Sequence, residues 1–301
     1  MVFIQLPLST RRMIMETKKV KITTDSASDL NDLFGQRDIG EFPLYVMLSD
    51  KQYLDDVDIK PTMIFDYYDK TGKLPQTAAR SIEDFYDYFK SFTDQGMSVV
   101  HIAISSQISS TYDYATAAAK RLDDVFVIDG RSLSSGTGLL ALAAADLRDD
   151  GHDAQTIAKT IEARKSEVQA SFMINTLDFL YKGGRCSGLA SFFGKALSIK
   201  PSLQLVNGNI TVARKYMGRF SKNILKYVDN TLEQYNSPDM KNVFITHTFA
   251  EPEVVESVRQ RLIEFGFAPE NIHETTAGST ITAHCGKSTL GILYINDGKK
   301  N

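Results

Sequence analysis

His284 is the histidine with the most reactive surroundings in this sequence. It lies two residues before Gly286 and close to the hydroxyl side chains of Thr280, Thr282, Ser288 and Thr289. A histidine among small polar groups can donate a hydrogen bond to an anion such as a carboxylate. A structural histidine, packed or bonded to the backbone, is the alternative interpretation of this position.

A glycine pair beside two cations forms another candidate site. Residues 181–185 read Tyr-Lys-Gly-Gly-Arg. If the backbone N–H groups of Gly183 and Gly184 point the same way as the Arg185 guanidinium, the three can bind one anion together. A helix that ends at glycine and leaves a solvated arginine is the competing interpretation.

Ser105 and Ser106 follow a strand-like apolar run, residues 99–104. Ligands of parallel α/β sheets bind beyond the carboxyl ends of strands, and Asp25 occupies a similar position, where it also suits a helix N-cap. A stand-alone hydrolase using Ser105 or Ser106 with His284 is an alternative function, although the chain has no Gly-x-Ser-x-Gly elbow. Hydroxyls at a strand end more often hold a ligand or cap the next helix.

Two glycine-containing stretches resemble nucleotide-binding motifs. Residues 286–289, Gly-Lys-Ser-Thr, match the end of a phosphate-binding loop, but Ile281 replaces the first glycine and a strand-like run follows. Residues 136–141 fit Gly-x-Gly-x-x-Ala, yet six residues separate them from Asp129 at the end of the preceding strand. We therefore expect loop glycines before a helix at residues 136–138, and a nucleotide-binding oxidoreductase is the weaker alternative.

Histidines and cysteines do not form a metal site in the sequence. The five histidines lack the short spacings of zinc ligands, and Cys186 and Cys285 do not supplement them. Two cysteines are too few for a disulfide framework, which favours the reducing cytoplasm. A disulfide between these two cysteines, each beside a candidate site residue, is the less favoured alternative.

Strands and helices alternate in the first half of the chain. The pattern predicts strands at residues 20–24, 41–48, 99–104 and 125–128, and helices at residues 61–68, 82–95, 112–121 and 139–147. Such alternation predicts a mostly parallel sheet covered on both faces by helices. We assign residues 18–168 to this N-terminal α/β domain and residues 1–17 to a tail.

The second half has a different pattern. After a helix at residues 154–167, an Asn-Gly turn at residues 207–208 joins two strand-like runs and predicts a hairpin. Further strands are expected at residues 170–175, 243–246, 271–276 and 289–295, and helices at residues 220–235 and 253–265. We assign residues 169–301 to an α+β domain with a partly antiparallel sheet.

Composition excludes several classes of protein. The 301 residues are 43% hydrophobic with a formal charge of −3, so the chain can bury a large core. We find no polybasic block typical of a nucleic-acid surface, and no apolar run near the ~20 residues that span a bilayer. Arg11 and Arg12 follow a short apolar start, whereas a secretory signal places its charges first. We expect a soluble, cytoplasmic protein.

Six fragments, taken in order, resemble the DegV family. They are residues 22–30, 74–77, 104–112, 180–185, 199–201 and 284–291. The resemblance extends from about residue 19 to the end of the chain. It implies a parallel N-terminal domain and a C-terminal α/β domain, with a lipid tunnel between or within them.

The resemblance also implies a function. DegV-like proteins bind a long-chain fatty acid such as palmitate, stearate or oleate, without a cofactor. By motif, Thr77, Ser105 or Ser106, and His284 hydrogen-bond the carboxylate, and Arg185 assists phosphoryl transfer or partner docking. A separate ATP-dependent, dihydroxyacetone-kinase-like subunit then phosphorylates the acid. The chain itself is expected to be a carrier without enzymatic activity, and its contact with membranes to be at most transient.

Three short stretches depart from the family pattern. Residues 77–80 read Thr-Ala-Ala-Arg where Thr-Ser-Gln-Pro is common, which removes a hydroxyl and brings Arg80 near the expected head group. Residues 109–110 are Ser-Ser instead of Ser-Gly, and residues 286–288 are Gly-Lys-Ser instead of Gly-Pro-Gly. We expect these changes to affect the shape of the site and its preference for acyl chains.

Overall fold

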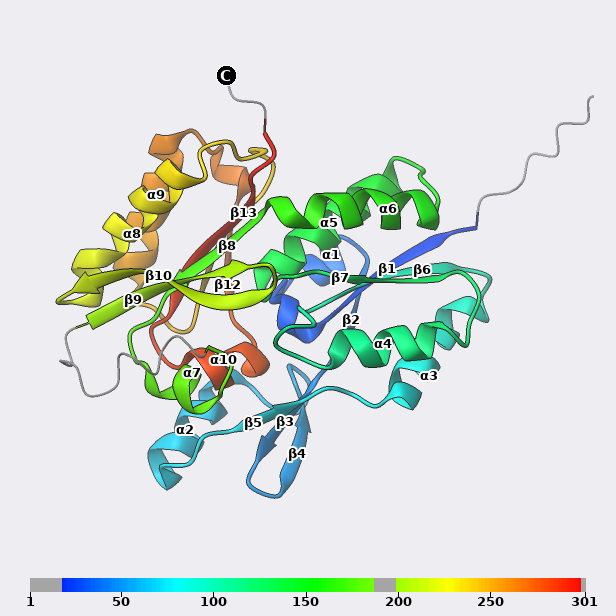
Figure 1. Ribbon diagram of the computed structural model, residues 1–301, viewed down its shortest axis with the longest axis horizontal. Helices are drawn as coiled ribbons and strands as arrows, with labels where there is room; N and C mark the ends of the chain where they lie inside the picture. Colours follow the sequence, from blue (N-terminus) through cyan, green and yellow to red (C-terminus); the bar gives the residue numbers. More distant parts are fainter. Residues whose placement is uncertain (1–17, 187–198, 299–301) are drawn as a thin grey trace, which may run out of the picture.

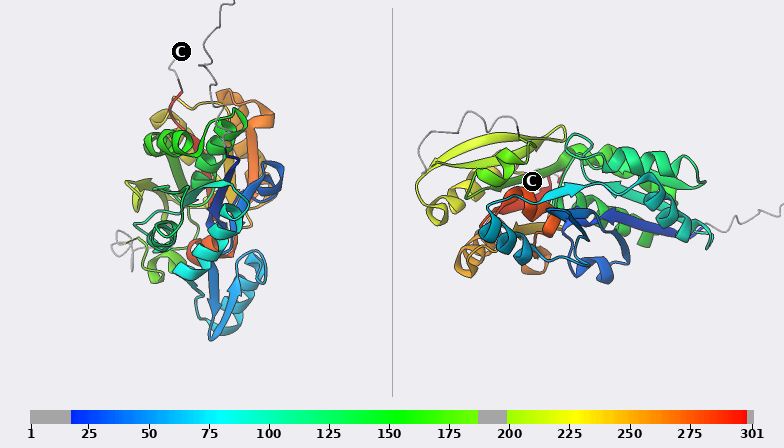
Figure 2. Two further views of the ribbon diagram at one scale, coloured as in Figure 1. Left: turned by 90° about the vertical axis from the view of Figure 1, so that its right-hand side faces the viewer. Right: turned by 90° about the horizontal axis from the view of Figure 1, so that it is seen from below.

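Three β-sheets organise the part of the chain that the computed structural model describes, residues 18–186 and 199–298. A parallel sheet occupies the N-terminal half and a larger mixed sheet the C-terminal half, with a small antiparallel sheet beside both (Figures 1 and 2). This arrangement confirms the predicted fold class. The predicted tail, residues 1–17, lies outside the described residues.

The parallel sheet has the strand order β2-β1-β6-β7. Its strands are β1 (Val20–Asp25), β2 (Ile39–Phe42), β6 (Ser98–Ala103) and β7 (Val125–Asp129). Helices α3 (Ile82–Thr93) and α4 (Thr111–Ala119) pack on one face, and α5 (Ser135–Asp149) and α6 (Ala154–Arg164) pack on the other. The short α1 (Leu33–Gln36) precedes β2. Every residue of β6 is buried, as expected for a central strand covered on both faces.

The C-terminal sheet has the order β10-β9-β8-β13-β11-β12. Its strands are β8 (Val168–Met173), β9 (Ile199–Val206), β10 (Asn209–Met217), β11 (Val243–His247), β12 (Ile272–Thr276) and β13 (Leu290–Ile295). Neighbouring strands are antiparallel except β11 and β12. Helices α8 (Phe220–Gln234) and α9 (Pro252–Phe265) pack against each other and against this sheet. The predicted Asn-Gly hairpin is β9–β10.

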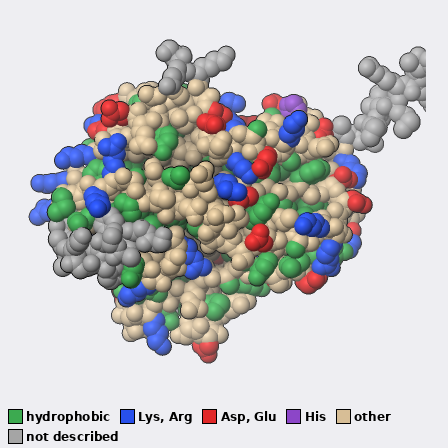
Figure 3. Space-filling view, in the orientation of Figure 1, with side chains coloured by type: hydrophobic (Ala, Val, Ile, Leu, Met, Phe, Trp, Pro, Cys, Tyr) green, Lys and Arg blue, Asp and Glu red, His purple; other side chains and the backbone are tan. Residues whose placement is uncertain are grey.

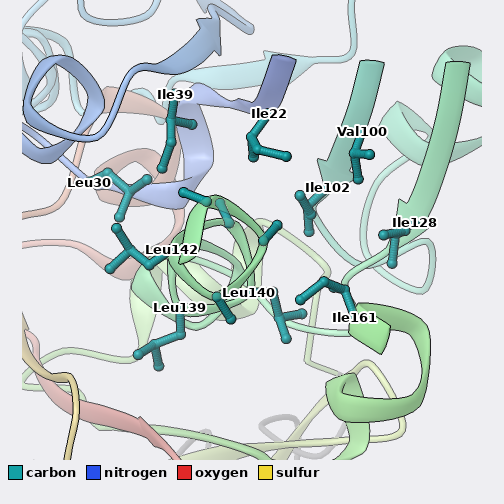
Figure 4. Packing of buried hydrophobic residues seen from close by; sticks show 14 of the residues in the cluster. Ile22, Leu30, Ile39, Val100, Ile102, Ile128, Leu139, Leu140, Leu142 and Ile161 are labelled. Carbon is teal, nitrogen blue, oxygen red and sulfur yellow. The ribbon is translucent and has the colours of Figure 1, made fainter. Parts of the chain in front are cut away.

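Helix α5 joins the two large sheets into one hydrophobic core. It contacts β1 and β6 of the parallel sheet and β8 and β13 of the other sheet. Figure 4 shows its leucines, among them Leu139 and Leu142, surrounded by isoleucines such as Ile22 and Ile102. A helix that is apolar all round must be covered on every side, and α5 meets that condition by lying between the sheets.

The two glycines of the Gly-x-Gly-x-x-Ala match lie inside the first turn of α5, so the prediction of a loop was wrong. A Cβ atom on Gly136 would lie 2.2 Å from Ser132 Oγ, and one on Gly138 would lie 2.7 Å from Leu30 Cδ2. These glycines therefore allow close packing of α5 against its neighbours.

The small sheet has the order β4-β3-β5. The predictions from sequence were least accurate for its segments. Its strands are β3 (Tyr45–Leu48), β4 (Lys51–Leu54) and β5 (Gln76–Ala78), with α2 (Pro61–Thr71) alongside. The predicted single strand at residues 41–48 is divided at Pro43 between this sheet and β2. Two short helices, α7 (Asp178–Lys182) and α10 (Ser279–Cys285), lie between the small sheet and the C-terminal sheet (Figure 1).

Within residues 18–186 and 199–298, every helix is too short or too polar to cross a membrane. The same residues contain no group of three His, Cys, Asp or Glu side chains that could hold a metal ion.

Candidate functional site

A cavity of about 530 Å³ lies where the three sheets meet. Elements from both halves of the chain line it: β5, the loop after β6, the start of α4, β10 and helix α10. Its wall is mixed: polar side chains alternate with an apolar set from Leu44, Ile104, Ile108, Leu133, Leu180, Ile210 and Ile281. Such a space suits a long apolar ligand that enters with one polar end.

The polar end of this cavity is formed by His284 on α10 and Thr77 on β5. His284 Nε2 lies 2.8 Å from Thr77 Oγ1, and both residues line the cavity. Burial lowers the pKa of His284 to about 4, with a further contribution from the positive charge of Arg185. The imidazole is therefore neutral at pH 7, and Nδ1 has no hydrogen-bond partner among the described residues. A neutral imidazole and a hydroxyl can together donate hydrogen bonds to a carboxylate.

Two buried carboxylates fix the start of α10. Asp55 accepts hydrogen bonds from the backbone N–H groups of the first two residues of α10, at 2.8 and 3.1 Å. Asp29 accepts another from the N–H of Gly278, at 2.8 Å. These N–H groups belong to the first turn, which a helix leaves unpaired. Side chains of the N-terminal half therefore set the position of His284 in the C-terminal half.

Asp25, at the end of β1, binds in a different way from the prediction. Its side chain does not cap the single 3-10 turn that follows, Ser26–Ser28. Instead, Asp25 Oδ2 accepts a hydrogen bond from the N–H of Ile104, at 2.8 Å. Burial raises the pKa of Asp25 to about 7. This hydrogen bond connects the end of β1 to the residue that follows β6.

Ser105 and Ser106 have different surroundings. Ser105 is fully buried, and its hydroxyl donates to the carbonyl of Gly208 in the β9–β10 turn, at 2.8 Å. Ser106 lines the cavity, but its hydroxyl donates to Asp129 Oδ2 at 2.6 Å. No hydrogen bond joins either serine to His284 among the described residues. The geometry therefore gives no support to a serine nucleophile with His284 as its base.

Ser105→Ala tests the structural role of that hydroxyl. We expect the free energy of unfolding, measured by urea denaturation, to fall by about 1 kcal/mol, because the Gly208 carbonyl loses its donor. Ser91→Ala is the control, since Ser91 is exposed and bonds within its own helix. It should change the free energy by less than about 0.5 kcal/mol. Equal effects of the two changes would contradict the role of Ser105.

Arg185 and the glycine pair lie just after α7. The N–H of Gly183 donates to Phe179 O and the N–H of Gly184 to Tyr181 O, at 2.9 and 3.1 Å. Of the two interpretations of this glycine pair, the hydrogen bonds support the helix that ends at glycine, because both N–H groups close the end of α7. Arg185 is exposed and lines the cavity at the same wall as His284.

Comparison with known proteins identifies the family of this fold. A family model described as "Uncharacterised protein, DegV family" matches residues 19–297. The chain belongs to the DegV family. A "Fatty acid-binding protein" from Thermotoga maritima is 30% identical over 281 residues, covering 91% of this chain and 96% of that protein.

Solved DegV structures have the same architecture. One is described as "Fatty Acid Binding of a DegV family Protein from Thermus thermophilus", with 28% identity, a TM-score of 0.84, and coverage of 92% of this chain and 99% of that one. Another, "DegV, a fatty acid binding protein from Bacillus subtilis", has 25% identity and a TM-score of 0.81, and covers 93% and 100%.

Arg80, one departure from the DegV pattern, does not lie near the expected head group as predicted. Arg80 is absent from the cavity wall. It forms an ion pair with Asp84 at 3.0 Å and lies over the rings of Phe42 and Tyr45. Its charge is satisfied there, so the cavity receives no added cation from this substitution. Residues 77–79 supply the wall instead.

Four further residues that line the cavity were not among the predicted site residues. Ser109, Ser110, Asp113 and Tyr114 line it from the start of α4. The Ser-Ser-Thr-Tyr fragment at residues 109–112 could have indicated them, because it contains the two serines and immediately precedes Asp113 and Tyr114. Cys285 also lines the cavity as a free thiol, and burial raises its pKa to about 12. Cys186 is buried in the same hydrophobic cluster.

Proposed function

We propose that this protein binds a long-chain fatty acid, such as palmitate, stearate or oleate, in the 530 Å³ cavity. The observation that carries the proposal is the Thr77–His284 pair, which lines the cavity together with a set of leucine and isoleucine side chains. The fatty-acid-binding descriptions of the relatives from Thermotoga maritima, Thermus thermophilus and Bacillus subtilis support it.

The apolar wall supplies most of the binding energy in this proposal. Burial of a C16 chain at ~0.8 kcal/mol per methylene contributes on the order of 12 kcal/mol before entropic losses. A free fatty acid gains a similar amount by entering a membrane. An enclosed cavity is therefore what a protein needs to hold the acid in water.

The head group needs donors, because a carboxylate buried without hydrogen bonds is costly. Thr77 and the neutral His284 can supply them, and Arg185 adds a positive charge at the same wall. Asp113 also lines the cavity, and like charges repel each other. We therefore place the carboxylate beside Thr77 and His284, and assign Ser106 at most a secondary contact.

We further propose that a separate ATP-dependent kinase phosphorylates the bound acid. A carboxylate oxygen attacks the terminal phosphorus of ATP, the bond to the ADP oxygen breaks, and an acyl phosphate forms. The resemblance of residues 286–289 to a phosphate-binding loop does not compete with this division of labour. These residues lie between α10 and β13, whereas such a loop precedes a helix.

Mass spectrometry of an organic extract tests the carrier function. We expect the protein purified from a bacterial host to release about one long-chain fatty acid per chain. Protein stripped of lipid should regain that stoichiometry after incubation with palmitate or oleate. An extract that stays empty after both incubations would contradict fatty-acid binding.

A further inference from the structure

A second cavity, of about 450 Å³, also borders the Thr77–His284 pair. It shares Thr77, Arg185 and His284 with the first cavity. The remainder of its wall comes from residues 72 and 74–76, from Phe179 and Lys182 of α7, from Gly183 after that helix, and from Ala283 of α10. A head group held by Thr77 and His284 is therefore in contact with two spaces, and the acyl chain fills one of them.

The second cavity is positively charged. Lys182 and Arg185 line it, and none of its described lining residues is acidic. Residues 179–228 contain nine Lys and Arg residues and no Asp or Glu, in a chain whose net charge is −3. Figure 3 shows Lys and Arg side chains gathered on the side that carries β10 and the start of α8. A field of this sign attracts anions toward the cavity.

His284 lines both cavities, and Gly183 packs against its ring. A Cβ atom added to Gly183 would lie 2.8 Å from His284 Nδ1, so the absence of a side chain at this position leaves room for the ring. His284 Nδ1 is buried without a hydrogen-bond partner among the described residues.

We propose that the second cavity binds the phosphoryl group of an acyl phosphate whose alkyl chain occupies the first cavity. This inference rests on the proposed fatty-acid function. A phosphoryl group attached to the carboxylate must extend away from the alkyl chain, and the second cavity is the space available there. The group carries a charge of about −1.5 to −2 at neutral pH. Lys182 and Arg185 are positioned to neutralise that charge, and Lys182 lines the second cavity without lining the first.

The test compares two ligands with the same alkyl chain. One is palmitate, and the other is 2-oxoheptadecylphosphonate, a stable mimic of palmitoyl phosphate in which a methylene replaces the bridging oxygen. We expect Lys182→Gln to weaken binding of the phosphonate about tenfold and binding of palmitate less than about twofold, measured by calorimetry. Lys222→Gln is the control, because Lys222 is exposed on α8 and lines neither cavity. It should leave both affinities unchanged.

Each other outcome has one meaning. If palmitate binds to wild-type protein but Lys182→Gln leaves the phosphonate affinity unchanged, the phosphoryl site is wrong and the carrier function stands. If neither ligand binds to wild-type protein, the carrier function itself fails. A third arm adds inorganic phosphate to palmitate-loaded protein. If Lys182 is needed for that binding but not for the phosphonate, the cavity holds a free phosphate and the assignment to acyl phosphate is overturned.

Discussion

Replacement of Asp55 by alanine is expected to lower the free energy of unfolding by about 3–5 kcal/mol, because several buried donors lose their acceptor. Asp55 is fully buried and accepts from two N–H groups of α10 and from the hydroxyl of Ser26. The N–H groups cannot reach water, so their desolvation is uncompensated in the variant. Urea denaturation measures the loss. Since α10 carries His284, we also expect weaker binding of palmitate by whatever folded protein remains.

Asp58→Ala is the matched control for this prediction. Asp58 lies in the same turn and also accepts from a backbone N–H, that of Leu54, but its side chain is exposed. Water can replace it, so the free energy of unfolding should fall by less than about 1 kcal/mol. Asp55→Asn should behave like Asp55→Ala, since an asparagine has one acceptor oxygen, whereas both carboxylate oxygens of Asp55 accept hydrogen bonds. If Asp55→Asn is as stable as the wild type, the hydrogen bonds from Asp55 to the N–H groups of α10 do not contribute to stability as predicted.

The sequence predicted the elements that repeat a clear pattern. The apolar strand β6 and the helix α3 behind its Ser81 cap were found close to their observed bounds. The capping box at Ser81 and Asp84 explains why, since it marks a helix start within four residues. Periodicity and capping are local signals, and a single segment is enough to reveal them.

No bounds were predicted from the sequence for the short elements, because they contain too few residues to show a periodic pattern. Helices α7 and α10 have five and seven residues, and strand β5 has three. Their conformations depend on distant partners: α10 on Asp55, and β5 on its pairing with β3. No window of the sequence around residue 279 indicates that a carboxylate 224 residues earlier will pair with that helix. Three-dimensional packing supplies this information.

The site was predicted by resemblance more than by local chemistry. Thr77 and His284 are 207 residues apart in the chain, and the structure brings them into contact. Ser105 and Ser106 are equivalent in the sequence, but the fold buries the first under the β9–β10 turn and exposes the second to the cavity. The motif therefore located the strand end correctly, and only packing distinguishes the two hydroxyls.

His284→Ala is expected to weaken palmitate binding about thirtyfold while the chain stays folded, because a buried carboxylate loses a donor and Thr77 loses its partner. Calorimetry on lipid-free protein measures the affinity, and circular dichroism checks the fold. Wild-type affinity in this variant would remove His284 from the head-group site. His273→Ala is the control, since His273 is also partly buried and hydrogen-bonded, to Asn242, but lines neither cavity.

The pH dependence of binding distinguishes a neutral His284 from a charged one. Burial and the charge of Arg185 lower its pKa to about 4, so the ring stays neutral, with a single N–H, between about pH 6 and 8. Palmitate affinity of the wild type should therefore be constant across that range, since a neutral donor set does not change. A histidine that titrated near its ordinary pKa of about 6.5 would instead bind the carboxylate more tightly as the pH fell below 7. An increase of that kind, lost in His284→Ala, would mean that a charged imidazolium holds the head group; a constant affinity supports the Thr77–His284 pair as a neutral donor set, with Arg185 as the cation beside it.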